Sequence, residues 1–587
     1  MSHDILGLME MYMYGMDDYG KKIVPPLPLS FDRVNEGRSP LSTAPLFQLP
    51  FEILGSILEH VSPASLASLA LVSHDCRQLA RSRQFASVLL DYSDSSFGLI
   101  SLLQRERQQR AVNEGLTVSP SLGACVRRMT VATHPDCMSL RHDITLDEEF
   151  ADLGKEVREE RIAKAARMYD VYLECIENIL SDGISLPNLE LLDWEDKIAL
   201  PPSFFNALAS SSIQHLKLFR VSIEEEFTIV PPGTLGTRGW PLRSLHLEIL
   251  PGIPRSGKFG TSTICNSILR LCASTLESLT WQSFGEGDPQ SFVTDLLDPP
   301  RFPELRNLKL LYIQPLDSSI LEAFLQDGLH ALEITPEPTS TALDFFQKGR
   351  SVSSLKTLIW CSIAHFPANQ VLEFLKANTQ LSKLSLPSNV PTVFAEMQLL
   401  PLLSRSFVGL TSLHLAIDDT TLSGLILETI GTLVSLGQIR LRAGEQSDWR
   451  FNWLIDHELI RSQLRGLPSL RKVAFSRDTY RSMFPGSGVD VDCYYPNRLL
   501  GPGEGFREDL SGNNTVWEQR HRERMLVEGN KYISEMPKLE WLHFGQITML
   551  VTLLSNTNKK TAVCLSEERD KCGNLLWEMF GSAELGF

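Results

Sequence analysis

The residue types that most often carry catalytic chemistry are present in this chain but form no recognised pattern. The ten cysteines include no C-x-x-C pair, and the thirteen histidines include no H-E-x-x-H spacing, so the sequence predicts neither a zinc site nor a metallopeptidase centre. A G-x-S-x-G nucleophile motif does not occur either. Cys564 and Cys572 lie eight residues apart with no obvious histidine partner, and we interpret both as packing residues.

Two other segments resemble functional motifs only superficially. The sequence GPGEGF at 501–506 lacks the lysine and the following Ser or Thr of a phosphate-binding loop. The charged run 520–524 is most simply a solvated helix face. We therefore expect a protein that is not an enzyme and that holds no cofactor and no metal.

Charge and composition exclude several classes of partner. The formal net charge of −16 makes the chain a poor candidate for binding nucleic acid or an anionic membrane. No run of eighteen apolar residues predicts a membrane span, and the acidic N-terminus lacks the features of a secretory signal. The unpaired cysteines are typical of a reducing compartment, so we expect a cytoplasmic or nuclear location, or both.

Most of the chain repeats one short apolar pattern, L-x-x-L-x-L. Four copies are strict, such as LRSLHL at 242–247, and nine more allow other apolar residues at the three positions. From Trp194 to Phe475 the third apolar position advances by 24 to 34 residues per copy. The thirteen copies lie at 126–131, 189–194, 213–218, 242–247, 276–281, 305–310, 329–334, 355–360, 381–386, 410–415, 436–441, 470–475 and 539–544.

The segments between the copies are typical of helices. SSILEAFLQDG at 318–328 and SGLILETIGTLV at 423–434 place apolar residues three and four apart. Each unit is thus predicted to be a strand, a turn and a returning helix, and stacking of the units must supply the core. Pattern and period resemble leucine-rich repeats, which implies an α/β solenoid, or horseshoe. The Asn that usually follows the third apolar position occurs here only as Asn389, so we expect irregular turns.

Several parts of the chain fall outside this repeat. A stripe of apolar residues predicts one long inserted helix packed on the solenoid, and a segment without helical or strand pattern predicts one long inserted loop. The predicted segments are a flexible leader at 1–44, a small helical unit at 45–88, a helical linker at 89–119, the solenoid at 120–547 with the inserted helix 155–183 and the loop 478–516, and a C-terminal helical cap at 548–587.

The small helical unit contains the stretch LPFEILGSILEHVSPASLASLALVSHDCRQLARS at 49–82. Its apolar residues follow helical spacing, and Ser62 before Pro63 is typical of a helix restart with a serine cap and a proline at the first helical position. Ser73 can cap a third helix. Three short helices with this many apolar residues exceed what so small a core can bury, so we predict that a partner covers the surplus.

This stretch resembles an F-box, whose pattern runs Leu-Pro-x-Glu-Ile/Leu, then Ile-Leu or Ile-Phe, then Leu-x-x-Leu-x-x-Val-Ser-x-x-x-Arg. The late aromatic residue, often Trp in that family, is Phe85 here. An F-box followed by leucine-rich repeats resembles a subclass of ubiquitin-ligase receptors. The C-terminal segments WEQRHRERMLVEGNKYISEMPKLEWLHFGQITM (517–549) and ERDKCGNLLWEMFG (568–581) resemble large fungal members of that subclass.

The resemblance implies that the F-box binds a Skp-type adaptor, which links to cullin and RING subunits in an SCF ubiquitin ligase. The chain would then be the substrate-recognition subunit. The residues expected to bind the adaptor are Leu49, Pro50, Glu52, Ile53, Leu54, Ile57, Leu58, Leu66, Leu69, Val72, Ser73 and Arg77. Three alternatives stay open: a helical cap on the solenoid, a leucine-rich-repeat scaffold independent of ubiquitination, and an enzyme with an unrecognised site.

The repeat register also suggests where a target protein would bind. In each strand, the residue between the second and third apolar positions points to the concave surface, as does the residue after the third. In the early repeats these positions include Asp193, Glu195, Lys217 and Glu248. In the later repeats the basic residues on this face are His414, Arg440, Arg442 and Lys472. Two interpretations remain: a site for an acidic or phosphorylated target, or charges that merely balance nearby acids.

Overall fold

The computed structural model describes most of the chain as two compact units, one up to Phe324 and the other from Leu325. Within the described residues, no helix is long and apolar enough to cross a membrane. The loop predicted at 478–516 lies outside them except for 513–516. The described residues are 31–37, 41–112, 121–145, 148–181, 183–223, 225–229, 240–251, 261–282, 300–313, 318–336, 341–362, 365–444, 446–447, 450–451, 453, 455–475, 513–544, 547–554 and 559–565.

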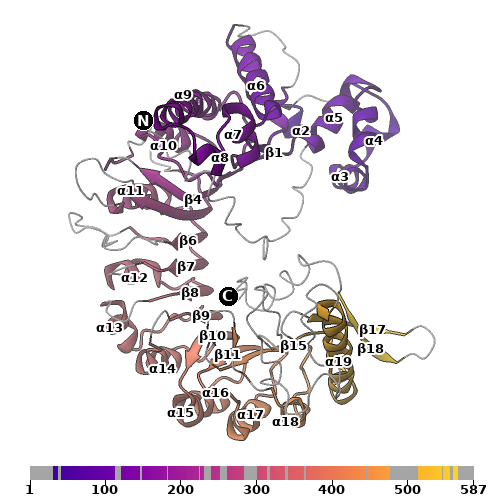
Figure 1. Ribbon diagram of the computed structural model, residues 1–587, viewed down its shortest axis with the longest axis vertical. Coiled ribbons are helices and arrows are strands. Elements are labelled where there is room, and N and C mark those ends of the chain that lie inside the picture. The colour runs from indigo at the N-terminus through magenta and orange to yellow at the C-terminus, as the bar shows by residue number, and fades with distance from the viewer. Residues whose placement is uncertain are drawn as a thin grey trace. The chain divides into compact units, whose positions relative to one another are not determined.

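In the described part of the first unit, short helices precede the sheet (Figure 1), and residues 1–30 and 38–40 of the predicted leader lie outside the described residues. Part of the segment expected to be a flexible leader is helical, because Phe31–Val34 forms a turn of helix. The three helices predicted from the serine and proline spacing follow, with Ser62 and Ser73 as the caps of the second and third. The elements are α2 (Phe31–Val34), the 3₁₀ helix η1 (Pro45–Gln48), α3 (Phe51–Glu59), α4 (Pro63–Leu69) and α5 (His74–Gln84).

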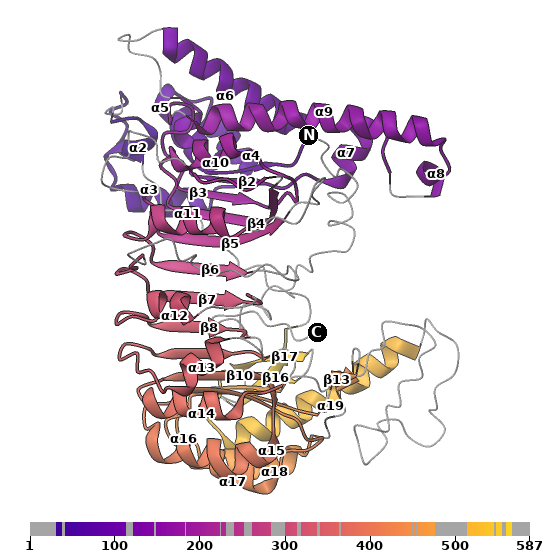
Figure 2. The same ribbon diagram turned by 90° about the vertical axis from the view of Figure 1, so that its left-hand side faces the viewer.

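The sheet of the first unit is parallel throughout, and its strands pair in chain order. Figure 2 shows β3 to β7 lying one above another. Equivalent apolar positions face each other, so that Leu192 pairs with Leu216, which pairs with Leu245. The strands are β1 (Ser87–Leu90), β2 (Arg128–Val131), β3 (Leu191–Trp194), β4 (His215–Ile223), β5 (Ser244–Pro251), β6 (Ser278–Gln282) and β7 (Asn307–Leu311).

Helices lie between most of these strands in the described residues and mainly on one face of the sheet (Figure 1). The longest, α9, occupies the segment where the sequence predicts an inserted helix, and Tyr169, Leu173 and Ile176 are among the side chains that it buries. The elements are α6 (Asp94–Val112), the 3₁₀ helix η2 (Gly123–Cys125), α7 (Pro135–His142), α8 (Glu148–Ala151), α9 (Lys155–Leu180), α10 (Pro202–Ala209), α11 (Ser262–Cys272) and α12 (Ser318–Phe324).

The second unit continues the same strand-and-helix repeat. Its parallel strands are β8 (Ala331–Ile334), β9 (Thr357–Trp360), β10 (Lys383–Val390), β11 (Ser412–Ile417), β12 (Gln438–Ala443), β15 (Lys472–Phe475) and β16 (Trp541–Phe544), and Gln446–Ser447 and Arg450–Phe451 form the short hairpin β13–β14. Its helices are α13 (Thr341–Gln347), α14 (Ala368–Ala377), α15 (Thr392–Phe394), the π-helix η3 (Ala395–Leu399), α16 (Leu400–Ser406), α17 (Gly424–Gly431), α18 (His457–Leu464) and α19 (Asn513–Glu535).

The described part of the predicted C-terminal cap at 548–587 differs from the helices expected there, and residues 566–587 lie outside the described residues. Residues 547–553 and 560–564 form two antiparallel strands, β17 (Ile547–Leu553) and β18 (Lys560–Cys564), that extend the sheet from β16. The helix that covers this end is α19, which precedes these strands. Asn530 Oδ1 on α19 accepts hydrogen bonds from Ala562 N (3.0 Å) and Thr561 Oγ1 (2.9 Å), which satisfies part of the edge strand.

The repeat predicted from the sequence is confirmed as the framework of both units. All thirteen copies of the apolar pattern coincide with a strand, β2 to β12, β15 and β16, and the second and third apolar positions are buried in each. One strand of the parallel stack was missed. β1 precedes the first predicted copy and pairs with β2. Phe85, which lies just before β1, and Val88 and Leu90 within it fit the same spacing. The stack therefore begins directly after α5, before the predicted linker at 89–119.

Candidate protein-interaction sites

The small helical unit has a core of its own. Leu54 and Leu58 of α3, Leu66 of α4 and Leu79 of α5 form one buried cluster. Partly buried apolar side chains surround this cluster: Leu46, Phe47, Leu49, Val61 and Leu69. This core joins all three helices of the unit.

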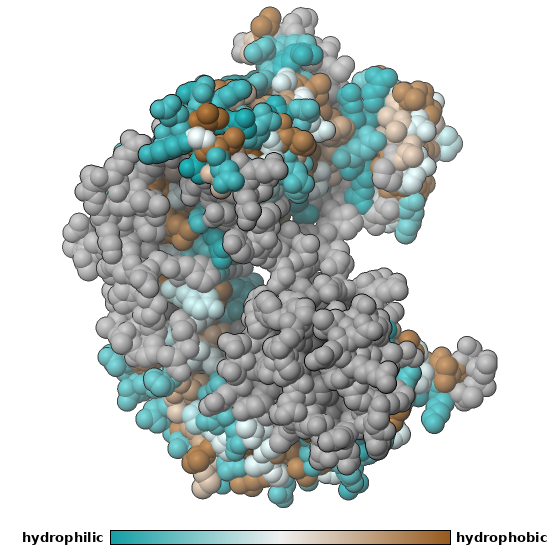
Figure 3. Space-filling view, viewed as in Figure 1, coloured by the Kyte–Doolittle hydropathy of each residue, from teal (hydrophilic) through white to brown (hydrophobic). Residues whose placement is uncertain are grey.

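Those remaining apolar residues face outward. The exposed fractions are 49% for Ile53, 41% for Ile57, 83% for Leu71 and 71% for Val72. Figure 3 shows the hydrophobic surface over α3 and α4. Solvent-facing aliphatic side chains grouped on one small helical unit are typical of a protein–protein interface. We name Ile53, Ile57, Leu71 and Val72 the apolar face.

The structure divides the twelve predicted adaptor-binding residues between this face and the core. Leu54, Leu58 and Leu66 are buried in the core cluster, so the prediction that these three side chains contact an adaptor is corrected. Leu49 and Leu69 are partly buried and pack against the same cluster. Ser73 acts locally, because its Oγ accepts a hydrogen bond from Cys76 N at 3.1 Å and caps α5. The exposed members are Pro50, Glu52, Ile53, Ile57, Val72 and Arg77.

Sequence reasoning missed Leu71, the most exposed of the four residues of the apolar face. The F-box pattern names the valine and serine that follow it but leaves this position open. The feature that could have identified Leu71 is the local turn after α4. Leu71 and Val72 follow the end of α4, where backbone hydrogen bonds to Ser68 O and Leu69 O close the chain before α5, so neither side chain can reach the core.

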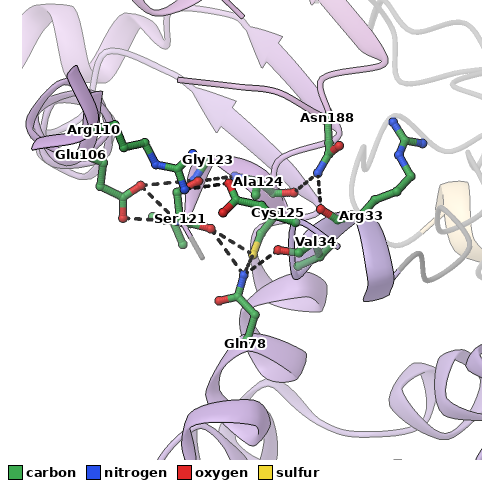
Figure 4. A network of polar contacts seen from close by, with 12 residues as sticks. Arg33, Val34, Gln78, Glu106, Arg110, Ser121, Gly123, Ala124, Cys125 and Asn188 are labelled. Atoms are coloured by element: carbon green, nitrogen blue, oxygen red, sulfur yellow. Dashed lines mark hydrogen bonds and ion pairs between the residues drawn. The ribbon is translucent and has the colours of Figure 1, made fainter. Parts of the chain in front are cut away.

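Buried polar contacts join the helical unit to the start of the sheet (Figure 4). Gln78 of α5 is 2% exposed, and its Nε2 lies 3.0 Å from Val34 O and 3.4 Å from Ser121 O. Asn188, in the segment before β3, donates from Nδ2 to Arg33 O (3.0 Å) and Ala124 O (2.7 Å). Sequence patterns gave no signal for these contacts, because they join segments that are far apart in the chain.

The junction is also tightly packed around η2. The backbone nitrogens of Leu122 and Gly123 donate to the Glu106 carboxylate of α6, at 3.0 Å and 3.4 Å from Oε2. A Cβ on Gly123 would lie 1.8 Å from Ser185 O, so only glycine fits this position. The first repeat therefore meets α5 through a rigid turn.

The second candidate site is the basic group of the later repeats. In the strand register, His414 of β11 pairs with Arg440 of β12, which pairs with Ala474 of β15. His414 is 3% and Arg440 is 7% exposed, so a partner cannot reach either side chain directly. Burial, together with Arg440 and Arg442, lowers the pKa of His414 well below its usual value, so this histidine is neutral. His414 is therefore removed from the predicted basic site.

The other two basic residues are partly exposed. Arg442 donates from Nη2 to Pro387 O (2.5 Å) and to Asn389 Oδ1 (3.1 Å), so part of its hydrogen-bonding capacity is used within β10 and β12. The Nζ of Lys472 lies 5.9 Å from the ring centroid of Trp541. The surface that a target could contact here is therefore smaller than the sequence predicts.

The acidic residues on the same face of the first unit are also paired. Lys217 Nζ lies 2.7 Å from Glu195 Oε1, and Arg220 Nε lies 3.2 Å from Glu248 Oε1. Burial raises the pKa of Asp193, although the charge of Lys217 opposes that shift. These contacts favour local charge balance over a free acidic surface.

The described residues contain no group of three or more His, Cys, Asp or Glu side chains that could hold a metal ion. Burial raises the pKa of the Cys125 and Cys272 thiols to about 12, which makes both poor nucleophiles. Chemistry at these two thiols is thus unfavourable, and the apolar face is the better-supported site.

Comparison with known proteins identifies one part of the chain. Residues 46–87 match the F-box domain family, so the small helical unit is an F-box domain. No curated protein matches the chain. Among solved structures, the chain is similar to an internalin from Listeria monocytogenes, with 15% identity and a TM-score of 0.26 over 52% of this chain and 80% of that one. It is also similar to TLR13 in a complex with ssRNA13, with 14% identity and a TM-score of 0.27 over 60% of this chain and 47% of that one.

Proposed function

We propose that this chain, which carries an F-box domain at residues 46–87, is the substrate-recognition subunit of an SCF-type ubiquitin ligase. The F-box would bind a Skp-type adaptor, and through it cullin and RING subunits, while the repeats would bind a target protein. The chain itself would catalyse no reaction and would work in the cytoplasm, the nucleus or both. Its relation to large fungal receptors remains a prediction from the C-terminal segments.

The observation that carries this proposal is the apolar face. Ile53, Ile57, Leu71 and Val72 lie outside the buried core cluster of the F-box and are exposed to solvent. Full burial of one such side chain contributes about 1.5–3 kcal/mol, and a few such residues at the centre of an interface dominate affinity. A face of this kind supports stable docking of an adaptor.

The repeats support the second half of the proposal more generally. Parallel strands stacked with return helices present an extended series of side chains on the sheet face away from the helices, a surface that solenoid proteins commonly use to bind other proteins. Because His414 and Arg440 are buried, Arg442 and Lys472 are the remaining members of the predicted target-binding set that a partner could contact. An acidic or phosphorylated target is a proposal that rests on these two.

The decisive experiment replaces an exposed leucine of the apolar face. Leu71→Asp should abolish recovery of the adaptor with the full-length protein, because a carboxylate at the interface would lose its water without gaining a partner. The matched control is Leu140→Asp on α7, because Leu140 is 84% exposed in the same unit, against 83% for Leu71. Neither change should alter the melting temperature by more than about 1 °C, since both side chains are in water.

The measurement is the amount of adaptor that copurifies with each variant. Loss with Leu71→Asp and full recovery with Leu140→Asp supports the proposal. Equal recovery with both variants would remove the apolar face as the docking site. If the unchanged protein recovers no adaptor, the alternative is favoured, namely a leucine-rich-repeat scaffold that acts independently of ubiquitination.

A further inference from the structure

The segment that precedes the F-box lies against both the F-box and the first repeat. Helix α2 contacts α5 of the F-box and also η2, which leads into β2. The main-chain carbonyls of its last two residues accept hydrogen bonds from two different parts of the unit, the F-box and the repeats. Val34 O accepts from Gln78 of the F-box, and Arg33 O accepts from Asn188 in the repeats. This turn of helix therefore contacts both the F-box and the first repeats, which the chain connects covalently only later, between α5 and β1.

Side chains reinforce the same bridge. Arg33 pairs through Nη1 with Glu190 Oε1 at 2.5 Å, and the other oxygen of Glu190 lies 2.7 Å from Arg127 Nη2, next to β2. Glu36 Oε1 lies 2.6 Å from Arg110 Nη2 on α6. We name residues 31–37 the clasp.

A further contact ties the chain between the clasp and the F-box core. Ser42 N donates to Asp75 Oδ2 at 2.6 Å, and Asp75 on α5 is 3% exposed. The segment before α3 is thus held to α5 at Val34 and again at Ser42. A segment fixed at both points cannot slide along α5.

The covalent connection between the F-box and the sheet is a single short one, and α5 also contacts η2 directly. Helix α5 ends at Gln84 and β1 begins at Ser87, so the backbone around residues 85 and 86 would act as a pivot if it were the sole attachment. A second attachment through the clasp removes that rotation, because two separated points of contact fix the orientation of one body on another.

We propose that the clasp is a positioning element that holds the F-box in one orientation on the first repeats, and that Gln78 of α5 is the central positioning residue on the F-box side. The proposal rests on the proposed function in one respect, that the apolar face binds an adaptor. The clasp would then set the angle at which a target on the repeats is presented to the ubiquitin-transferring subunits.

Gln78 offers a nearly isosteric test. Its amide nitrogen faces the carbonyl oxygens of Val34 and Ser121 and the sulfur of Cys125. Gln78→Glu keeps the shape of the side chain but places a carboxylate oxygen against those acceptors, so attraction becomes repulsion. The matched control is Gln84→Glu, because Gln84 is an exposed glutamine on the same helix.

The readout is the distance distribution between spin labels in the full-length protein. Labels on noncanonical amino acids at Ala67 in α4 and Arg167 in α9 occupy exposed positions of the first unit. The unchanged protein and Gln84→Glu should each give one narrow distribution. Gln78→Glu should give a distribution roughly twice as wide while adaptor recovery stays unchanged, since the domain would move as a rigid body.

A narrow distribution in Gln78→Glu with adaptor still bound would overturn the proposal. If Gln78→Glu also loses the adaptor, the F-box itself has been disturbed and a second series decides. Glu36→Arg, outside the F-box, should widen the distribution, and the double change Glu36→Arg with Arg110→Glu should narrow it again. No widening in Glu36→Arg would equally overturn the clasp. Absence of the adaptor from the unchanged protein would refute the proposed function but leave these distances as a test of the clasp.

Discussion

Glu190 shows how one carboxylate can hold a junction together. It lies between Arg33 of the clasp and Arg127, the residue before β2, with one oxygen directed at each guanidinium. Burial by itself would raise the pKa of Glu190, but hydrogen bonds and charge from Arg127 and then Arg33 outweigh it and hold the pKa below its usual value. The charged form is therefore the one that the folded state favours.

This shift predicts the direction of a pH effect on the free energy of unfolding. A carboxylate whose pKa is lowered on folding stabilises the protein above its unfolded pKa, about 4.3, and loses that contribution as the pH falls through the folded pKa. Glu190→Gln should therefore be less stable than the unchanged protein at neutral pH, and the difference should shrink steadily below about pH 4.3. Chemical denaturation of both proteins across this range gives the measurement. A difference that grows on acidification would contradict the assignment.

The F-box residues show what a sequence pattern can and cannot predict at this scale. The pattern located the domain and its two serine caps, because cap and proline spacing depend on local backbone geometry. It could not separate Leu54 from Ile53, which are neighbours in α3 but differ from 1% to 49% in exposure. Both residues are apolar, and a small domain with an apolar core and an apolar outer face has no polar residues to mark the boundary.

The strands were predictable for a different reason. Each copy of the repeat must align its second and third apolar positions with those of its neighbours, so a fixed pattern recurs wherever a strand stacks. The sequence did not reveal β1, because Phe85 was already assigned to the end of the F-box. The apolar pattern also could not distinguish helix from strand after residue 547, because the antiparallel pair β17–β18 does not follow the repeat or its period.

Because the strands are stacked, the stability of each strand depends on its neighbours. A single buried charge can test this dependence. Leu308 of β7 is 1% exposed and faces Leu279 of β6. Leu308→Asp should destabilise the first unit by at least about 3 kcal/mol, because it loses a buried leucine and buries an unpaired carboxylate. Circular dichroism melting and amide hydrogen exchange across β5 to β7 give the measurement.

The control for this change lies one residue earlier. Asn307 begins the same strand but is exposed, so Asn307→Asp should change the free energy of unfolding by no more than about 0.5 kcal/mol. Similar melting of the two variants would mean that the repeat register assigned to β7 is wrong. If protection from amide hydrogen exchange is lost only in β7, the neighbouring strands do not unfold together with it.

At the scale of the whole molecule, the chain separates its two proposed tasks between two units. The F-box and the clasp contacts lie in the unit that ends at Phe324, whereas Arg442 and Lys472 lie in the unit that begins at Leu325. Each unit has its own buried strand cores, and α19 covers the edge strand of the second. If the packing of the second unit is lost, the first unit should therefore still bind the adaptor.

Leu413→Asp tests this separation. Leu413 of β11 is fully buried between Leu384 and Ile439 on the neighbouring strands, so a carboxylate there should unfold the second unit. Amide hydrogen exchange should show protection lost from β10 to β12 but kept in α3 to α5. Adaptor recovery should equal that of the unchanged protein, because every residue of the apolar face belongs to the first unit. Loss of the adaptor together with that protection would mean that the two units fold as one cooperative body, and the separation of tasks would then fail.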